Sequence, residues 1–283
     1  MFLLFDIGGT KMRIARSRDG EAFDEPIVLK TPLDDFEAGV KMFAAAAREL
    51  TGGQEIAAAA GGVAGPLNRE KTGLVRAPNI PGWVGKPLKS EFERALGTSV
   101  LLENDAALAG LGEANAGAGK GFEIVAYVTI STGVGGARIV DGRIDRSRFG
   151  FEIGHQIVRM DEADVGSASA GEAGHIESYI SGTAFAERYG MKAAEVRERE
   201  AWERASRELA VALNNVAVFW SPEIIVLGGS MITGDPAIPL GQVEQYFTNV
   251  LKIFSEKPVL RKAALGDSGG LHGALVLAAS SKQ

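Results

Sequence analysis

The sequence predicts an α/β protein made of two related lobes with a ligand cleft between them. Two regions about 120 residues apart, 2–20 and 124–142, share one order: apolar strand, glycine turn with hydroxyl groups, second strand, Asp-Gly pair. A further apolar run at 100–102 stops at three polar residues and passes into an alanine-rich helical pattern. This is expected of a buried parallel strand followed by a helix, and ligands of open α/β sheets bind at such strand ends.

Composition narrows the class of protein. The 283 residues are 46% hydrophobic, which suffices for a packed core and about two domains. The net charge of −6 contains no basic block, so nucleic acid and anionic membranes are not expected partners, whereas a small neutral or phosphorylated ligand is. With no cysteine, disulfides and thiolate metal sites are excluded. No apolar run approaches the roughly 20 residues that span a bilayer, and no signal peptide is recognisable, so a cytoplasmic location is predicted.

The first repeat predicts a β-hairpin instead of a strand-to-helix phosphate loop, because an alternating strand follows its turn and ends at an Asp-Gly pair. Paired glycines expose backbone N–H groups as an anion nest, and a carboxylate beside them can hold a cation that screens phosphate charge. An ordinary glycine turn is the alternative, but the second copy favours a phosphate site. The candidate residues are Asp6, Gly8, Gly9, Thr10 and Lys11.

The second repeat has a strand at 124–130, a glycine turn and a strand ending before Asp141-Gly142. Its phosphate-binding candidates are Thr132, Gly133 and Gly135. Two such turns, one from each lobe, could grip one phosphate chain from both sides.

Between the repeats, the pattern predicts a helix at 34–50, a strand at 55–60 that runs into Gly61-Gly62, and a helix at 87–96. The loop at 76–83 holds Asn79 between prolines, and a carboxamide held in this way suits a sugar hydroxyl because it can both donate and accept. Trp83 in the same loop is explained equally well as part of the ligand-binding loop or as a structural side chain that fills the core.

Asp105 follows the central strand directly, with Asn104 beside it. A carboxylate at this strand end can orient a hydroxyl group and accept its proton. The alternative for Asp105 is helix capping, which Asn and Asp favour strongly. The phosphate-binding turns elsewhere favour catalysis.

The rest of the chain adds ligand-binding candidates. Glu152 and His155 lie in a loop-like stretch, and Glu177 is expected one turn inside a helix, where a solvated helix face is the alternative. A long helix at 193–220 precedes a strand at 223–227 that ends at Gly228-Gly229, against which adenosine could lie. Helices at 242–254 and 271–279 follow. The predicted lobes are 1–105 with 268–283, and 106–267.

Six motifs in this order resemble the ROK family (repressors, open reading frames and kinases), most of all its glucokinase-type sugar kinases. They are Asp6-Ile7-Gly8-Gly9-Thr10-Lys11, Pro78-Asn79-Ile80-Pro81-Gly82-Trp83, Glu103-Asn104-Asp105-Ala106, Ser131-Thr132-Gly133-Val134-Gly135-Gly136, Glu152-Ile153-Gly154-His155 and Leu227-Gly228-Gly229. The resemblance implies a two-lobed, actin-like (ribonuclease-H-like) ATPase fold that binds sugar and ATP. A homodimer is the family expectation.

The resemblance also implies roles. Asp105 would be the base, and the sugar hydroxyls would be held by Asn79, Asn104, Glu152, His155 and Glu177. Both glycine hairpins would bind the phosphates of ATP, with Asp6 helping to place Mg²⁺, and Gly228 and Gly229 would border the adenosine. Phosphoryl transfer consists largely of positioning and charge neutralisation, so these parts suffice.

One motif departs from the family. Many members bind structural zinc through the His of the Gly-His pair and three cysteines in Cys-x-Cys-Gly-x-x-Gly-Cys-x-Glu, whereas the matching positions here are Ala168, Ala170 and His175. His155 and His175 alone cannot complete a tetrahedral site, so no structural zinc is expected. Something other than a metal must then orient His155.

An ATP-dependent hexose kinase, most simply a glucokinase, is the leading hypothesis. Kinases of N-acetylmannosamine or fructose, and polyphosphate as the donor, remain open. A repressor would carry a helix-turn-helix segment before the first hairpin, and none is recognisable. A non-catalytic sugar-binding protein is disfavoured by Asp105 and the two hairpins.

Overall fold

The computed structural model describes residues 1–159 and 174–280. Its chain forms two compact units. Unit 1 comprises residues 1–116, 148–150 and 267–283, and unit 2 comprises residues 117–147 and 151–266.

Unit 1 is built on a five-stranded sheet in the order β3-β2-β1-β4-β5. Strands β1, β4 and β5 are parallel, while β1, β2 and β3 pair antiparallel. The predicted first hairpin is therefore confirmed as β1 and β2. The strand bounds are β1 Phe2–Ile7, β2 Lys11–Ser17, β3 Ile27–Lys30, β4 Ala58–Val63 and β5 Val100–Asn104.

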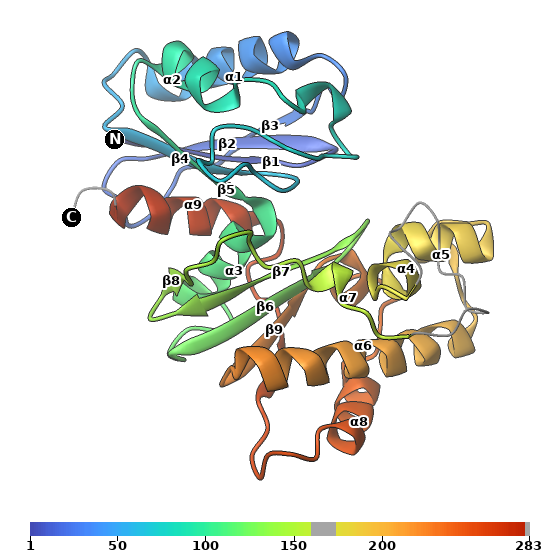
Figure 1. Ribbon diagram of the computed structural model, residues 1–283. Helices are drawn as coiled ribbons and strands as arrows, with labels where there is room; N and C mark the ends of the chain where they lie inside the picture. The colour runs from blue at the N-terminus through green and yellow to red at the C-terminus, as the bar shows by residue number, and fades with distance from the viewer. Residues whose placement is uncertain (160–173, 281–283) are drawn as a thin grey trace. The chain divides into compact units, whose positions relative to one another are not determined.

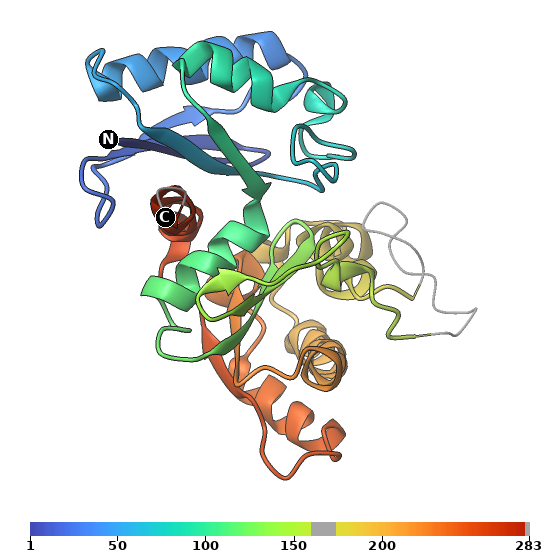
Figure 2. The same cartoon turned by 60° about the vertical axis from the view of Figure 1, so that its left-hand side comes forward.

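Helices cover both faces of this sheet (Figures 1 and 2). On one face lie α1 (Phe36–Thr51) and α2 (Leu88–Leu96), and on the other α3 (Asp105–Ala116) and α9 (Gly269–Ser280). The core under α1 and α2 contains four phenylalanine rings, of which those of Phe43 and Phe92 stack with centroids 4.0 Å apart. Trp83, in the 3₁₀ turn Pro81–Trp83, is fully buried in the same core, so of its two predicted roles the structural one is observed.

The pair α3 and α9 packs through glycines. A Cβ atom at Gly273 would collide with the carbonyl group of Leu108, and one at Gly112 would collide with the carbonyl oxygen of Gly269. Because no side chains separate them, the two helix backbones lie in direct contact. This seam joins the helix after Asp105 to the last helix of unit 1.

Unit 2 repeats the strand order of unit 1. Its sheet runs β10-β9-β6-β7-β8, with β6 and β7 as an antiparallel hairpin, β9 and β10 parallel to β6, and β8 antiparallel to β7. The predicted repeat of related α/β units is thus confirmed at the level of topology. The bounds are β6 Ile124–Ile130, β7 Val134–Val140, β8 Arg143–Ile144, β9 Ile224–Gly228 and β10 Val259–Lys262.

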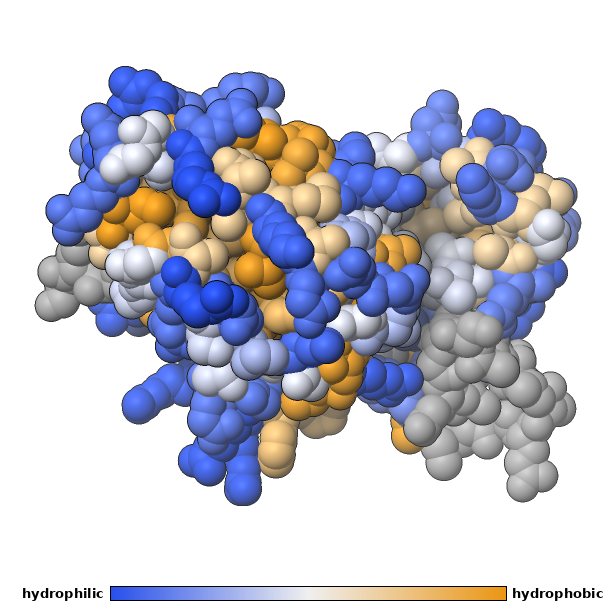
Figure 3. Space-filling model, turned by 90° about the horizontal axis from the view of Figure 1, so that it is seen from above, coloured by the Kyte–Doolittle hydropathy of each residue, from blue (hydrophilic) through white to orange (hydrophobic). Residues whose placement is uncertain are grey.

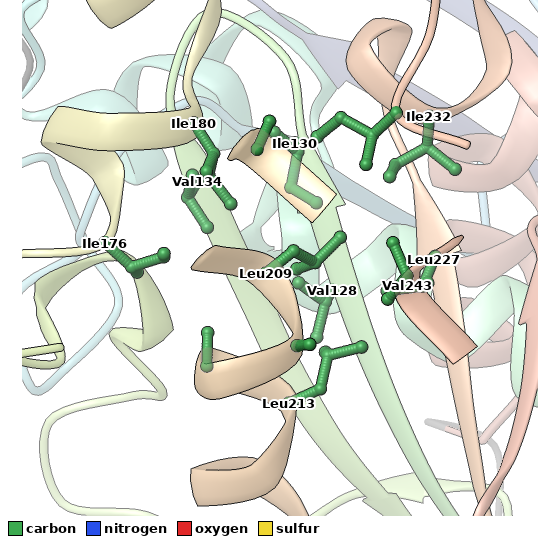
Figure 4. Close-up of a cluster of buried hydrophobic side chains, with 14 of the residues drawn as sticks. Val128, Ile130, Val134, Ile176, Ile180, Leu209, Leu213, Leu227, Ile232 and Val243 are labelled. Carbon is green, nitrogen blue, oxygen red and sulfur yellow. The ribbon is translucent and has the colours of Figure 1, made fainter. Parts of the chain in front are cut away.

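The core of unit 2 lies between this sheet and its helices (Figure 4). Leu209 and Leu213 of the long helix contribute to the same buried cluster as Val128 of β6. The helix bounds are α4 Glu177–Ile180, α5 Gly182–Tyr189, α6 Arg199–Trp220, α7 Ser230–Thr233 and α8 Leu240–Val250, with 3₁₀ turns at Ile153–His155, Ala193–Glu195 and Gly266–Ser268.

Four predicted boundaries were wrong. The helix expected at 242–254 is α8, which ends at Val250. The strand expected at 55–60 is β4, three residues later, and it contains Gly61 because a Cβ atom there would overlap the ring of Phe5. The long helix starts at Arg199, after a separate 3₁₀ turn. Glu177 is the first residue of α4 and does not lie one turn inside a helix.

The face of the molecule in Figure 3 intersperses hydrophilic and hydrophobic residues. Within the part of the chain that the structure describes, no helix combines the length and apolar character needed to cross a lipid bilayer.

Candidate active site

The junction of β5 and α3 carries the predicted base. Asn104 caps α3, since its Oδ1 accepts the backbone N–H of Ala107 at 3.1 Å. Its Nδ2 donates to the carbonyl oxygen of Gly65 at 3.2 Å, so the same side chain ties down the loop after β4. Asp105 is half-buried, and its Oδ1 accepts the N–H of Ala106 at 2.9 Å. Capping in the usual geometry is therefore the work of Asn104 and not of Asp105.

Glu103 precedes this pair and is buried. Its carboxylate forms an ion pair with Lys71 and accepts the backbone N–H of Asn104 at 3.0 Å. Lys71 adopts a left-handed backbone with φ +51°, which is uncommon for a side chain of this size. The approach of Lys71 to the strand end could not be predicted from the sequence, because its loop has no periodicity.

Register brings the predicted acidic residues to one edge of the unit 1 sheet. Asp6 of β1 is paired with Gly62 of β4, and Gly62 with Glu103 of β5. An ideal Cβ atom at Gly62 would lie 3.1 Å from the Cα atom of Asp105. Asp6 and Asp105 thus both stand at carboxyl ends of parallel strands in one sheet, with a glycine strand between them.

Asp6 is only slightly exposed. Burial raises its pKa to about 6, the neighbouring Arg13 guanidinium at 3.9 Å lowers it in part, and Asp267 raises it. Arg13 also pairs with Asp267, so it joins two carboxylates. The helix α9 approaches closely, because a Cβ atom at Gly270 would lie 2.9 Å from the Cγ atom of Asp6. Arg13 and Asp267 are 254 positions apart, which is why the sequence did not identify the pair.

The first hairpin turn is held by one threonine. Thr31 donates its N–H to the carbonyl oxygen of Thr10 at 3.1 Å and its hydroxyl to that of Gly8 at 2.7 Å. The N–H of Gly8 donates to the carbonyl oxygen of Lys11 at 3.0 Å, so an anion at this turn would be bound by the N–H groups of Gly9 and Thr10. Thr10 and Lys11 are exposed.

The first hairpin also contacts the loop of Asn79. A Cβ atom at Gly9 would lie 2.7 Å from the Cβ atom of Asn79, so only glycine fits there. Asn79 itself is exposed, whereas the next residue, Ile80, is fully buried and anchors the loop. The structure therefore brings a predicted sugar ligand against a predicted phosphate loop within unit 1.

The second hairpin is held in the same way. Thr183, at the start of α5, donates its N–H and its hydroxyl to the carbonyl oxygen of Thr132, at 3.2 Å and 2.9 Å. Thr132 is exposed, and Gly135 lies inside β7 opposite Thr129. Each hairpin turn is therefore held by one threonine from another segment of its own unit. Neither threonine was recognised from the sequence, where each lies outside the repeated motif.

Glu177 fastens the second turn to α4. Its Oε2 accepts the backbone N–H of Val134 at 2.7 Å, and a Cβ atom at Gly133 would lie 2.7 Å from that oxygen. Gly154 packs on the other side of Val134, since a Cβ atom there would collide with its carbonyl oxygen. The flanking residues Glu152 and His155 are exposed. Three of the predicted sugar ligands therefore gather around one turn of unit 2.

The imidazoles of His155 and His175 face each other, with their Nδ1 atoms 3.2 Å apart. Among residues 1–159 and 174–280, no three side chains of His, Cys, Asp or Glu come together as a metal site. The remaining positions of the motif discussed for zinc, 168–173, lie outside the described residues. Two imidazoles supply half of a tetrahedral site, so this donor set does not fit structural zinc.

Magnesium requires oxygen ligands and keeps several of its waters, so one carboxylate beside a phosphate-binding turn suffices. Asp6, at the end of β1 and two residues before Gly8, fits this need. Its raised pKa indicates a carboxylate that gains from a nearby cation.

Gly228 and Gly229 have packing reasons for being glycine. A Cβ atom at Gly228 would lie 2.5 Å from the hydroxyl of Tyr127. Gly229 has φ +86° and abuts the carbonyl group of Ile130. Contact of either with adenosine stays a prediction.

A family model matches residues 3–281, and its description is ROK family. The chain belongs to the ROK family. It is 29% identical to the N-acetyl-D-glucosamine kinase of Escherichia coli O6:H1, over 98% of this chain and 99% of that protein.

Two solved structures extend the comparison with the ROK family. The ROK hexokinase of Thermus thermophilus superposes with a TM-score of 0.84 at 29% identity, covering 99% of this chain and 98% of that one. The ROK family glucokinase of Streptomyces griseus, in complex with glucose and AMPPNP, gives 0.79 at 27% identity, covering 99% of both chains. The predicted fold class, an actin-like α/β ATPase fold, is confirmed.

Proposed function

We propose that this ROK protein transfers the γ-phosphoryl group of ATP to a hydroxyl group of a hexose, with glucose as the first candidate. The observation that carries the proposal is the β5 and α3 junction. Asn104 caps the helix, and the half-buried carboxylate of Asp105 follows it directly at the carboxyl end of a parallel strand. A base in this position can accept the proton of the attacking hydroxyl group as the bond to phosphorus forms.

The phosphate chain would be bound by the two glycine hairpins. Thr31 and Thr183 hold carbonyl groups of the two turns and so fix their backbones, which supports phosphate binding at both turns. Mg²⁺, when bound, screens the charge on the phosphate oxygens, and Asp6 would be its protein ligand. Thr10, Lys11 and Thr132 are exposed and could add donors.

The sugar would be held by carboxylate, amide and imidazole groups, for which the candidates are Asn79, Asn104, Glu152, His155 and Glu177. The glucose complex of the similar Streptomyces griseus glucokinase supports a hexose as the ligand.

An N-acetylhexosamine is the second candidate substrate. It is favoured by the similarity to the Escherichia coli N-acetyl-D-glucosamine kinase along nearly the whole chain. N-acetylmannosamine and fructose complete the set to be compared.

The test is a coupled assay with Mg²⁺ and either ATP or polyphosphate against glucose, fructose, N-acetylglucosamine and N-acetylmannosamine. We expect one sugar to be preferred with ATP, and activity to be lost in Asp105→Asn. Sugar binding without turnover, with either donor, would instead support a non-catalytic protein. Full activity in the Asp105→Asn variant would remove Asp105 as the base.

A further inference from the structure

His175 lies directly against a predicted sugar ligand, His155. Their rings are nearly perpendicular, with an interplanar angle of 86° and centroids 5.3 Å apart. The two Nδ1 atoms are 3.2 Å apart, within the range of a hydrogen bond. Two ring nitrogens attract each other at this distance when one carries a proton and the other presents its lone pair.

The backbone fixes this approach of the two rings. Ile157 and His175 form an antiparallel bridge, and the N–H of Ile176 donates to the carbonyl oxygen of Gln156 at 3.0 Å. The buried hydroxyl of Ser178 donates to the carbonyl oxygen of His175 at 2.7 Å. The segment of His175 is therefore paired with the residues just after His155, and its carbonyl is secured at the start of α4.

We propose that His175 is a positioning residue that holds the imidazole of His155 through Nδ1 and leaves Nε2 of His155 for a sugar hydroxyl. The hydrogen bond at one ring nitrogen determines which nitrogen carries the proton. A hydroxyl group both donates and accepts, so it can pair with Nε2 in either tautomer. The inference rests on the proposed function, because it assigns a sugar hydroxyl to His155.

A shared metal ion is the competing explanation for the same geometry. Two nitrogens at about 2.0–2.1 Å from a tetrahedral zinc would stand roughly 3.3 Å apart. The two explanations differ in what lies between the nitrogens. With a proton there, the orientation of the His155 ring does not depend on metal, whereas with zinc it would depend on the metal content of the protein.

The first experiment compares His175→Ala with His175→Asn, whose side-chain amide can replace the Nδ1 interaction. For His175→Ala we expect the KM for sugar to rise roughly 5- to 10-fold, as for the loss of one hydrogen bond, with kcat within about twofold and the KM for ATP unchanged. His175→Asn should recover most of the sugar KM. An unchanged sugar KM in His175→Ala would overturn the proposal, as would equal changes in both KM values in both variants.

The second experiment needs no activity and so separates this inference from the proposed kinase function. In ¹⁵N-labelled full-length protein, imidazole NMR should find a proton on Nδ1 of one of the two rings, and this signal should vanish in His175→Ala. The wild-type protein, dialysed against chelator, should keep the signal and its sugar affinity. Protons on Nε2 alone in both rings, or one stoichiometric zinc whose removal weakens sugar binding, would overturn the proposal.

Discussion

Glu177 Oε2 accepts the backbone N–H of Val134 at 2.7 Å and so connects the start of α4 to the second glycine turn. One carboxylate therefore serves two predicted functions, since Glu177 is a candidate sugar ligand and the turn is a candidate phosphate site. Through Glu177, a ligand bound at one of these two sites would restrict the motion of the other site.

We expect Glu177→Ala to raise the KM for sugar and the KM for ATP together, each by roughly 10-fold or more, because a hydrogen bond to a charged group contributes about 1.5–3 kcal/mol. Steady-state kinetics with each substrate varied will measure this. Glu223→Ala is the matched control, because the Glu223 carboxylate accepts the N–H groups of Glu123 and Ile124 at the amino end of β6, the opposite end from the turn. Its KM values should not move; a rise in sugar KM alone for Glu177→Ala would contradict the coupling.

Substitutions at Asn104 and at Asp105 should have different effects, the first on the stability of the fold and the second on catalysis. Asn104→Ala removes the cap of α3 and should lower the free energy of unfolding by about 1 kcal/mol. Asp105→Asn should leave stability within about 0.5 kcal/mol but reduce kcat by roughly 10²- to 10⁴-fold, as for loss of a general base. Denaturant titrations and kinetics on both variants check this, and a large loss of stability in Asp105→Asn would mean that Asp105 acts as a structural residue.

Asp6 should make the fold less stable as pH rises. Its pKa is about 6 in the native state against an ordinary value of 3.8, so between these pH values the native state holds a proton that the unfolded state has released. Stability from this group is therefore present below pH 3.8 and lost as pH rises to about 6.

Asp6→Asn should accordingly stabilise the protein at pH 7 by at most about 3 kcal/mol, taking about 1.4 kcal/mol per pKa unit, and change little at pH 4. Unfolding measured at both pH values in chelator tests this. Mg²⁺ with ATP should then stabilise the wild type more than the variant. An Asp6→Asn protein that is less stable than wild type at pH 7 would contradict the assignment.

The glycine seam between α3 and α9 predicts a sharp contrast between two helical glycines. Gly273→Ala should cost about 1–3 kcal/mol or more, because its Cβ atom would overlap the backbone of Leu108. Gly241→Ala, in α8 with open space around it, should be neutral or stabilise by up to about 1 kcal/mol. Thermal unfolding of both variants is the measurement, and equal effects would refute the close contact of the backbones.

The sequence was most informative where chemistry repeats along the chain. The succession of strand, glycine turn and strand occurs twice, and it could be recognised because the alternating pattern of a hairpin is local. The two sheets take the corresponding strand order. The edge of β4 was misplaced because Gly61 resembles a turn residue until the ring of Phe5 is known to lie against it.

Contacts between segments distant in sequence could not be predicted. Lys71 reaches Glu103 across 32 positions, and His155 meets His175 across 20 positions. Both depend on how loops fold back on strand ends, which periodicity does not report. The position of Asn104 at the end of a strand could be predicted from the sequence. Its role as the cap of α3 could not, because the pattern does not show whether Asn104 or Asp105 occupies the capping position.

The α9 seam has a consequence for the order in which the protein takes shape during synthesis. Arg13 of β2 forms an ion pair with Asp267, which is 254 positions later. Helix α9 packs on β1 and β4 of the first sheet. Unit 2 is built from residues 117–147 and 151–266, all translated before α9. Unit 2 can therefore begin to fold before α9 is made, while the face of the first sheet that α9 shares with α3 is still partly uncovered.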